Sequence, residues 1–243
     1  SGNTEEALSS FSEATKKNAA IIALTSGGKL LAMAKKYGIP VVLVPAGILP
    51  RFALGYLTGA TLGILTLLKV IKNPQKAIIA SYKKVGVKSP KREAKKLACF
   101  FTNKIPLVYT TDTWSILGHL FKISFNETAK IPAFSHVLPE MNHNELQGFA
   151  AKPLYFNKNF VALFLKEKNL NRRLYKRFQL TQKFLYQRGQ IHFVESRLPG
   201  NNFWENLIYG ASLAYWTGYF VSQKRSANPM DDSVIEEFKA LMA

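Results

Sequence analysis

Cysteines and metal-binding patterns are nearly absent from this sequence. Cys99 is the one cysteine among 243 residues, so an internal disulfide is excluded and a reducing compartment, the cytoplasm, is expected. The four histidines lack the spacing of a metal site such as HExxH. We therefore expect no metal and no cofactor.

Long apolar segments are missing too. Phe52–Leu68 and Asn206–Gln223 are uncharged, but Gly, Thr, Ser and Asn residues interrupt them. A membrane span needs about twenty predominantly apolar residues. We therefore expect no membrane partner, and we predict that both segments are helices buried in a globular core.

Acidic residues are scarce. The chain has 15 Asp and Glu against 33 Lys and Arg, which gives a formal charge of +18, and the excess is concentrated in Lys152–Arg197. A nucleic-acid surface is one interpretation. The other is a solvated helix face that attracts small anions, since the aromatic residues of Leu170–Gln187 recur at the spacing of a core-facing stripe. Charge alone therefore makes nucleic acid a weak expectation as a partner.

What the sequence does contain is an α/β pattern. The apolar run Ala19–Leu24 is predicted to be a strand buried on both faces. The loop Thr25–Gly28, a helix over Lys29–Tyr37 and a second buried strand over Val41–Val44 follow it. This order is typical of a right-handed crossover unit with a parallel sheet. Ligands of such sheets bind beyond the carboxyl ends of the strands, where the loop Thr25–Gly28 is expected.

Two segments of the first part suit an anion. Ser1–Glu6 reads SGNTEE and precedes a helix predicted over Glu5–Lys17. Hydroxyl and N–H groups at a helix N-terminus bind phosphate, although an ordinary helix cap predicts the same local shape. Pro45 begins a helix predicted to continue through Leu68, with Arg51 in its first turn. A cation is unfavourable there, so Arg51 is expected to have an anionic partner in the protein or in a ligand.

The pattern is interrupted at Gly86–Pro90, and we place a domain boundary there, between residues 1–88 and 89–243. The second part again alternates helices and strands. Strands are predicted over Ile105–Thr110, Pro132–Val137, Phe160–Leu165 and Ile191–Glu195, and helices over Pro90–Asn103, Asp112–Phe125, Leu170–Gln187, Asn202–Gln223 and Asp232–Met242, with a further one beginning at His143.

The segment Asn126–Glu145 contains a candidate acid–base pair. Glu127 and His143 lie sixteen positions apart (143 − 127 = 16). A carboxylate and an imidazole are the usual groups for moving protons to and from carbon and oxygen. Taken alone, a Glu in an amphipathic segment is more often a solvated helix residue, so the pair depends on its context.

That context resembles a known family. SGNTEE, the LTSGGKL of Leu24–Leu30 and the step Pro50-Arg51 resemble the sugar isomerase (SIS) domain. NETAKIPAF, PEMNHNE and NPMDDSVIEEFK, in this order, resemble the bifunctional phosphoglucose/phosphomannose isomerases. The resemblance spans essentially the whole chain and implies an α/β fold of two SIS-type, three-layer domains, with parallel sheets flanked by helices. The first domain is expected to be incomplete, with its opening strand and loop upstream in a longer protein.

The resemblance also implies roles for individual residues. Glu127 would be the base that moves a proton between C2 and C1 of the sugar. His143 would assist ring opening from the partner subunit of a homodimer, and Lys239 would lie at the same ring-opening site. Arg51 would stabilise the negative charge of a cis-enediolate. These types suit the chemistry, because proton removal beside a carbonyl needs a base and leaves an anion.

The implied reaction interconverts glucose 6-phosphate, and mannose 6-phosphate as well, with fructose 6-phosphate, while Ser1 and Thr4 hold the phosphate of the hexose. The alternative is a non-catalytic sugar-phosphate sensor on the same fold, with or without a nucleic-acid partner. A sensor would need the phosphate loop but neither Glu127 nor His143.

Three segments depart from the pattern of the family. Gly118–Phe121 stands where the helix before NETAK usually contains an arginine, Asn228–Asp231 replaces the usual DPTP, and Thr128 occupies the position of an Asn. These departures are expected to affect sugar preference or activity.

Overall fold

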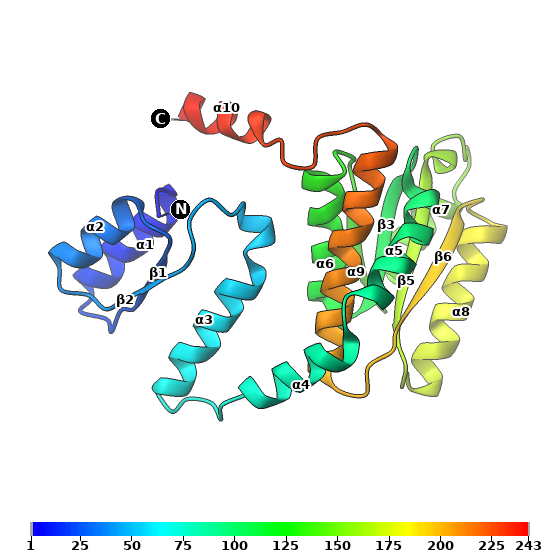
Figure 1. Cartoon of the computed structure of the whole chain (residues 1–243). Helices are drawn as coiled ribbons and strands as arrows, with labels where there is room; N and C mark the ends of the chain where they lie inside the picture. Colours follow the sequence, from blue (N-terminus) through cyan, green and yellow to red (C-terminus); the bar gives the residue numbers. More distant parts are fainter. Residues whose placement is uncertain (1, 243) are drawn as a thin grey trace. The chain divides into compact units, whose positions relative to one another are not determined.

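The computed structural model describes residues 2–242, which form two compact units, one up to Gln75 and one from Lys76 onward (Figure 1). Both units combine helices with parallel strands, so the predicted α/β class is confirmed. Among the described residues, no helix is both long enough and apolar enough to cross a membrane.

The first unit is a small two-stranded parallel sheet with helices packed on it. Its core consists of Phe11, Ala23, Leu30 and Ala34. The elements of this unit are α1 (Glu5–Lys16), β1 (Ala23–Thr25), α2 (Gly28–Lys36), β2 (Val41–Leu43), the 3₁₀ turn η1 (Pro50–Phe52) and α3 (Leu54–Leu67).

The two strands of the first unit are shorter and less buried than predicted. β1 begins at Ala23 rather than Ala19, and β2 has no fully buried residue, with Leu43 63% exposed. The physical reason is that β1 and β2 pair only with each other among the described residues, so no neighbouring strand covers the second edge of β2. The apolar run before β1 is therefore an extended connection and not a buried strand.

Helix α3 also differs from its prediction. It begins only after the separate turn η1, and none of its side chains is buried, although we predicted a core helix. Gly55, Gly59 and Gly63 recur every four residues, and the larger apolar residues point in several directions around the helix axis. The helix therefore has no single apolar stripe, and Leu67 at its end is 84% exposed.

The second unit is a three-layer α/β assembly. Its parallel sheet has the order β4-β3-β5-β6, with α5, α6 and α9 on one face and α7 and α8 on the other (Figure 1). The strands are β3 (Ile105–Thr111), β4 (Phe134–Leu138), β5 (Phe160–Glu167) and β6 (His192–Leu198), and the main helices are α4 (Gln75–Val85), α5 (Lys88–Phe101), α6 (Ser115–Ile123), α7 (Met141–Ala150), α8 (Arg172–Gln187), α9 (Phe203–Lys224) and α10 (Ser233–Met242).

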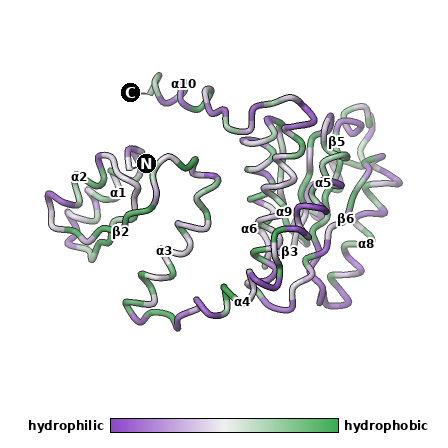
Figure 2. The backbone as a smooth tube through the Cα atoms, viewed as in Figure 1, coloured by the Kyte–Doolittle hydropathy of each residue, from purple (hydrophilic) through white to green (hydrophobic). Residues whose placement is uncertain are grey.

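The core of this unit follows the two inner strands. β3 and β5 are buried along nearly their whole length, as expected for apolar strands covered by helices on both faces. Tyr109, Phe164 and Phe178 pack together between the sheet and α8. Figure 2 shows the contrast between this apolar sheet and the hydrophilic segments along the outer helix α8.

Helix α9 lies against the sheet and confirms the prediction of a buried helix for Asn206–Gln223. Asn202 caps its start, because the Asn202 side chain accepts a hydrogen bond from the Glu205 N–H at 2.9 Å. The Glu205 carboxylate also accepts from Lys84 Nζ at 2.8 Å, which fastens α4 to α9. This Lys84 ammonium lowers the pKa of Glu205 below its ordinary value.

The end of α6 has an unusual shape. Residues Ser124–Thr128 form a π-helical turn, η3, in which the Ala129 N–H donates to the Ser124 carbonyl five residues back, at 3.0 Å. Such a turn contains one more residue than an α-helical turn. It overlaps only the last two residues of the helix that we predicted over Asp112–Phe125, and regular periodicity does not reveal it.

Candidate active site

Glu127 lies in the π-turn η3, and its backbone is held from several sides. Asn126 Oδ1 accepts a hydrogen bond from the Ala133 N–H at 2.8 Å, which ties the turn to the start of β4. Lys130 Nζ donates to the Glu127 carbonyl at 2.7 Å. Phe125 and Thr128 on either side are buried, while Glu127 itself is partly exposed. The chain therefore anchors the backbone of a partly exposed glutamate.

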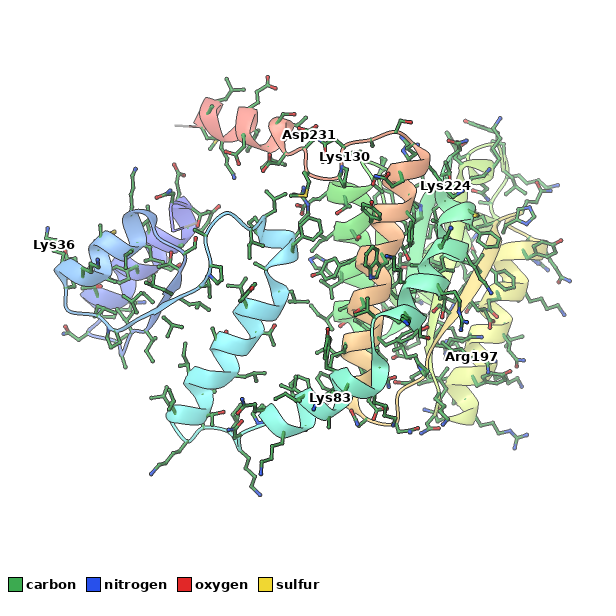
Figure 3. The ribbon with its side chains drawn as sticks, in the orientation of Figure 1. Lys36, Lys83, Lys130, Arg197, Lys224 and Asp231 are labelled. Atoms are coloured by element: carbon green, nitrogen blue, oxygen red, sulfur yellow. The ribbon has the colours of Figure 1, made fainter. Side chains whose placement is uncertain are left out.

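Lys130 also links this turn to the segment before α10. Its ammonium donates to the main-chain carbonyl of Asp231 as well as to that of Glu127, and Figure 3 shows Lys130 beside Asp231. Lys130 has a positive φ of 57°, a conformation that costs energy for a residue with a Cβ. The NETAK and NPMDD motifs, about a hundred positions apart, therefore meet at a single ammonium group.

The PEMNHNE motif forms the start of α7, and three of its seven side chains hold that helix in place. Met141 is buried in the core. Asn142 donates to the Thr181 hydroxyl at 2.6 Å, and Glu145 accepts from the Tyr109 hydroxyl at 2.7 Å. His143, in contrast, is exposed. The motif thus fixes the helix with its other residues and presents the imidazole outward.

The sequence alone did not single out the contacts of Glu145. Its second carboxylate oxygen lies 2.7 Å from His136 Nδ1, so His136, Glu145 and Tyr109 form one chain of hydrogen bonds across β4, α7 and β3. Burial and the adjacent Glu145 carboxylate raise the pKa of Tyr109 well above its ordinary value. The phenol therefore remains a hydrogen-bond donor and anchors α7 to the sheet.

Glu127 and His143 lie at opposite ends of β4. The turn that holds Glu127 is bonded to Ala133, immediately before the strand, while His143 follows the strand at the start of α7. Five strand residues separate the two positions, a distance of roughly 15 Å or more. The structure therefore does not bring these two predicted residues together within one chain.

Lys239 lies on the last helix, α10, and is exposed. Its ammonium pairs with Glu236 Oε1 at 2.6 Å, and this hydrogen bond raises the pKa of Lys239 above its ordinary value. Among the described residues, α10 has no buried side chain, and Phe238 is 63% exposed.

In the first unit the two loops of small residues meet. The Gly2 carbonyl accepts from the Leu30 N–H at 2.8 Å, and Asn3 Oδ1 accepts from the Lys29 N–H at 2.9 Å. Gly2 has a φ of +76°, and a Cβ there would lie 2.0 Å from the Gly27 carbonyl oxygen, so only glycine fits. The starts of α1 and α2 therefore lie beside each other.

Thr4 is the residue that precedes α1, with extended backbone, but its hydroxyl makes no capping hydrogen bond. Ser1, the other predicted phosphate ligand, lies outside the described residues. Arg51 lies in the turn η1 with its guanidinium 5.2 Å from the centre of the Phe52 ring. Arg51 is partly buried. It lies in a helical turn as predicted, but that turn is η1, which is separate from the helix α3 that follows.

Two of the departures from the motif pattern of the family involve Thr128 and His119. The Thr128 hydroxyl is buried and has no hydrogen-bond partner among the described residues. His119 lines a cavity of about 360 Å³ with Ser115, Ser135 and His136. Within residues 2–242, no group of three or more His, Cys, Asp or Glu side chains is arranged to hold a metal ion.

Comparison with known proteins agrees with these motifs. The family model described as the bacterial phospho-glucose isomerase C-terminal SIS domain matches residues 90–242. A bifunctional phosphoglucose/phosphomannose isomerase of Aquifex aeolicus is 33% identical over 239 residues, which are 98% of this chain and 72% of that protein. The corresponding protein of Thermoplasma volcanium is 30% identical over 247 residues, covering 100% of this chain and 75% of its own.

The fold is shared with solved structures as well. A hypothetical protein of Thermus thermophilus superimposes with a TM-score of 0.74 over 100% of this chain and 68% of its own, at 16% identity. That likeness concerns the fold alone. The family model and the two relatives lead to one conclusion: the chain belongs to the bifunctional phosphoglucose/phosphomannose isomerase family, with a C-terminal SIS domain over residues 90–242.

Proposed function

We propose that the protein is an aldose–ketose isomerase that interconverts glucose 6-phosphate, and also mannose 6-phosphate, with fructose 6-phosphate through a cis-enediolate. The two aldoses differ only at C2, and that centre is lost in the ketose, so one proton-transfer machinery serves both. The observation on which the proposal depends is the position of Glu127, a partly exposed residue in a turn whose backbone is fixed by Asn126 and Lys130.

In this proposal Glu127 removes the proton from C2 and returns it to C1. A base that serves two neighbouring carbons needs a precise location, because a proton transfer requires hydrogen-bond reach in each direction. The tethers on either side of Glu127 provide that precision. The reaction moves protons and changes no net oxidation state of the sugar, so acid–base groups supply the chemistry it requires.

Three residues of the first part of the chain are assigned to the charges of the substrate. Thr4 precedes α1, and the N–H groups at a helix start favour a phosphate. Ser1 is assigned the same role from the resemblance. Arg51 is assigned to the enediolate, because a guanidinium stabilises negative charge that develops on oxygen.

His143 and Lys239 are assigned to ring opening, in a homodimer. His143 is exposed and lies a strand length from Glu127 of its own chain, which supports its use by a second copy. The raised pKa of Lys239 keeps its ammonium protonated, so in this role it would act as a fixed cation or proton donor.

The decisive experiment is Glu127→Gln, which keeps the shape of the side chain and removes the base. We expect kcat to fall about a thousandfold or more while fructose 6-phosphate binding is retained. Glu237→Gln, an exposed carboxylate on α10, is the matched control and should leave kcat unchanged. Isomerisation at the normal rate in Glu127→Gln would refute the assignment of the base.

The alternative of a non-catalytic sensor is less favoured. The two relatives described above are named as isomerases, and they match nearly the whole chain. A sensor also gives no reason for two tethers on the turn of Glu127. We further propose a cytoplasmic enzyme of hexose-phosphate metabolism, for which an exposed thiol such as Cys99 suits a reducing environment.

The domain boundary near residue 88 is also kept as a proposal. The compact units divide thirteen residues earlier (88 − 75 = 13), because α4 packs with the second unit through Lys84 and Glu205. The family model nevertheless begins at residue 90. We infer that α4 is a connecting helix that precedes the C-terminal SIS domain.

A further inference from the structure

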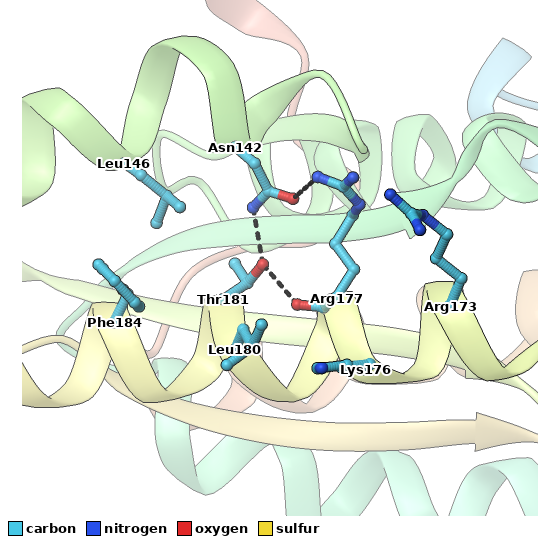
Figure 4. Close-up of a pocket in the computed structure, with 8 residues that line it drawn as sticks. All are labelled: Asn142, Leu146, Arg173, Lys176, Arg177, Leu180, Thr181 and Phe184. Carbon is cyan, nitrogen blue, oxygen red and sulfur yellow. Dashed lines mark hydrogen bonds between the residues drawn. The ribbon is translucent and has the colours of Figure 1, made fainter.

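A pocket between α7 and α8 has no role in the isomerisation proposed above. It has a volume of about 370 Å³, and Figure 4 shows its lining. One end is cationic, with Arg173, Lys176 and Arg177, and the other end is apolar. Volumes of this order are at the lower end of the range for small-molecule sites.

The three cations are not neutralised by a carboxylate of the described chain. None of the ion pairs found among residues 2–242 includes Arg173, Lys176 or Arg177. Arg173 also belongs to the first turn of α8, where the helix dipole disfavours positive charge, and that turn contains no acidic residue. A bound anion would relieve both unfavourable interactions.

One of these cations is held in a defined position. Arg177 Nη1 donates to Asn142 Oδ1 at 3.2 Å, and the Asn142 amide donates to the buried Thr181 hydroxyl at 2.6 Å. The Thr181 hydroxyl in turn donates to the Arg177 carbonyl at 2.8 Å. Figure 4 shows this chain of hydrogen bonds at the back of the pocket. The network orients the guanidinium but contains no carboxylate, so it does not neutralise the positive charge of Arg177.

The other end of the pocket suits a flat apolar group. Leu146, Leu180 and Phe184 line it, and Phe184 is 43% exposed. Phe184 follows Arg177 by seven helical residues, so roughly 10 Å along the axis separates the cationic end from the aromatic ring. A ligand that uses both ends needs an anionic group and an uncharged ring some distance apart.

We propose that this pocket binds a nucleoside phosphate, with its phosphates at Arg173 and Arg177 and its base against Phe184. A phosphate group presents several acceptor oxygens to guanidinium donors, and aromatic side chains stack on bases. A sugar phosphate without a base would leave the apolar end unused. The pocket would thus be separate from the phosphate site assigned to Thr4.

The test measures ADP, pyrophosphate and adenosine binding to the whole chain by isothermal titration calorimetry. We expect ADP to bind more tightly than pyrophosphate, and adenosine to bind weakest. Arg173→Gln should weaken ADP binding about tenfold, because a charged hydrogen bond is lost. Arg172→Gln removes the same charge from the neighbouring position, which does not line the pocket, and should leave ADP affinity within about twofold.

A second variant examines the apolar end. Phe184→Ala should weaken ADP binding and leave pyrophosphate binding unchanged, so the difference between the two ligands disappears. Equal effects of Arg172→Gln and Arg173→Gln would show general attraction to the positive surface and overturn the proposal. Binding of a single-stranded oligonucleotide that neither Arg173→Gln nor Phe184→Ala weakens would also overturn it. The same holds if the wild-type chain binds no ADP and Arg173→Gln changes only its dimerisation.

Discussion

The two ends of strand β4 differ in how the chain treats its candidate catalytic residues. Before the strand, Glu127 is part of a turn held by Asn126 and Lys130, close to buried neighbours. After the strand, His143 lies in the first turn of α7, where Met141, Asn142 and Glu145 make contacts that hold the helix, while its own side chain is exposed. The first arrangement suits a base that must meet two carbons within its own chain. The second suits a group that acts on something outside its own chain.

This difference predicts that two inactive variants restore each other. Glu127→Gln and His143→Ala should each be nearly inactive alone. In mixed dimers, one site would combine an intact Glu127 with an intact His143 of the partner. An equal mixture should therefore recover roughly a quarter of the wild-type activity, since half of the dimers are mixed and each has one intact site. Unfolding and refolding the two variants together, followed by a coupled assay, provides the measurement.

If both residues act within one chain, the mixture stays inactive, and the assignment of His143 to the partner is wrong. A mixture of Glu127→Gln with itself is the control and should remain inactive.

The tether at the first end can be removed separately from the base. Asn126→Ala deletes the acceptor of the buried Ala133 N–H, which should destabilise the protein by about 1–3 kcal/mol and lower kcat more than it changes KM. Asn126→Asp keeps an acceptor oxygen and should retain most of both properties. Urea unfolding and steady-state kinetics report the two effects, and equal kinetics in both variants would mean that the tether does not position Glu127.

Lys130→Met should have a smaller effect on the same end of the strand. It keeps the length of the side chain but removes the donor shared by the Glu127 and Asp231 carbonyls. We expect a loss of about tenfold in kcat/KM, because one charged hydrogen bond to each segment is lost. Lys122→Met, on α6, is the control, and similar kinetics of the two variants would argue against a role for the link.

At the second end, Tyr109→Phe tests how α7 is held. The buried ring stays in place, and the hydrogen bond to Glu145 is lost. Glu145 remains partly exposed and regains water, so the free energy of unfolding should fall by only about 1 kcal/mol. Chemical denaturation measures this value, and a fall of several kcal/mol would mean that the contact has a larger structural role than its geometry indicates.

The smallest effect concerns pH. Burial disfavours the Glu195 carboxylate, but hydrogen bonds from Lys166 and Gln182 outweigh it and lower the pKa of Glu195 below the ordinary 4.5. The folded state therefore holds the proton less tightly than the unfolded state, so this stabilisation is present above pH 4.5 and is lost as the pH falls through the lower, folded pKa. Glu195→Gln should reduce the slope of unfolding free energy against pH in that acid range, and an unchanged slope would contradict the assignment.

The sequence predicted regular elements well where their patterns are local. The apolar runs of β3 and β5 and the amphipathic stripe of α8 lie within a few residues of their predicted limits. Burial was harder to predict, as Leu43 and α3 show, because it depends on neighbours that no local pattern describes. The separation of Glu127 from His143 likewise depends on where β4 lies in the chain, which spacing in sequence does not give.

Contacts between distant motifs could not be predicted either. Glu145 reads as a helix residue of the PEMNHNE motif, yet it bonds to Tyr109 and His136 on two strands. Lys130 reads as a surface cation and instead joins two motifs. Such contacts depend on the order of the strands in the sheet, and only the tertiary structure gives that order.

The π-turn η3 has a consequence for how this region could change through insertion and deletion. A π-turn holds one more residue than an α-helical turn, and each residue of an α-helix turns about 100° around the axis. Deleting one residue from Ser124–Thr128 would therefore restore regular winding and shift the side chains of the turn by up to about that angle. A single-codon loss would thus redirect the carboxylate of Glu127 without altering its identity. The direction in which the Glu127 side chain points therefore depends on the number of residues in the turn as well as on their identity.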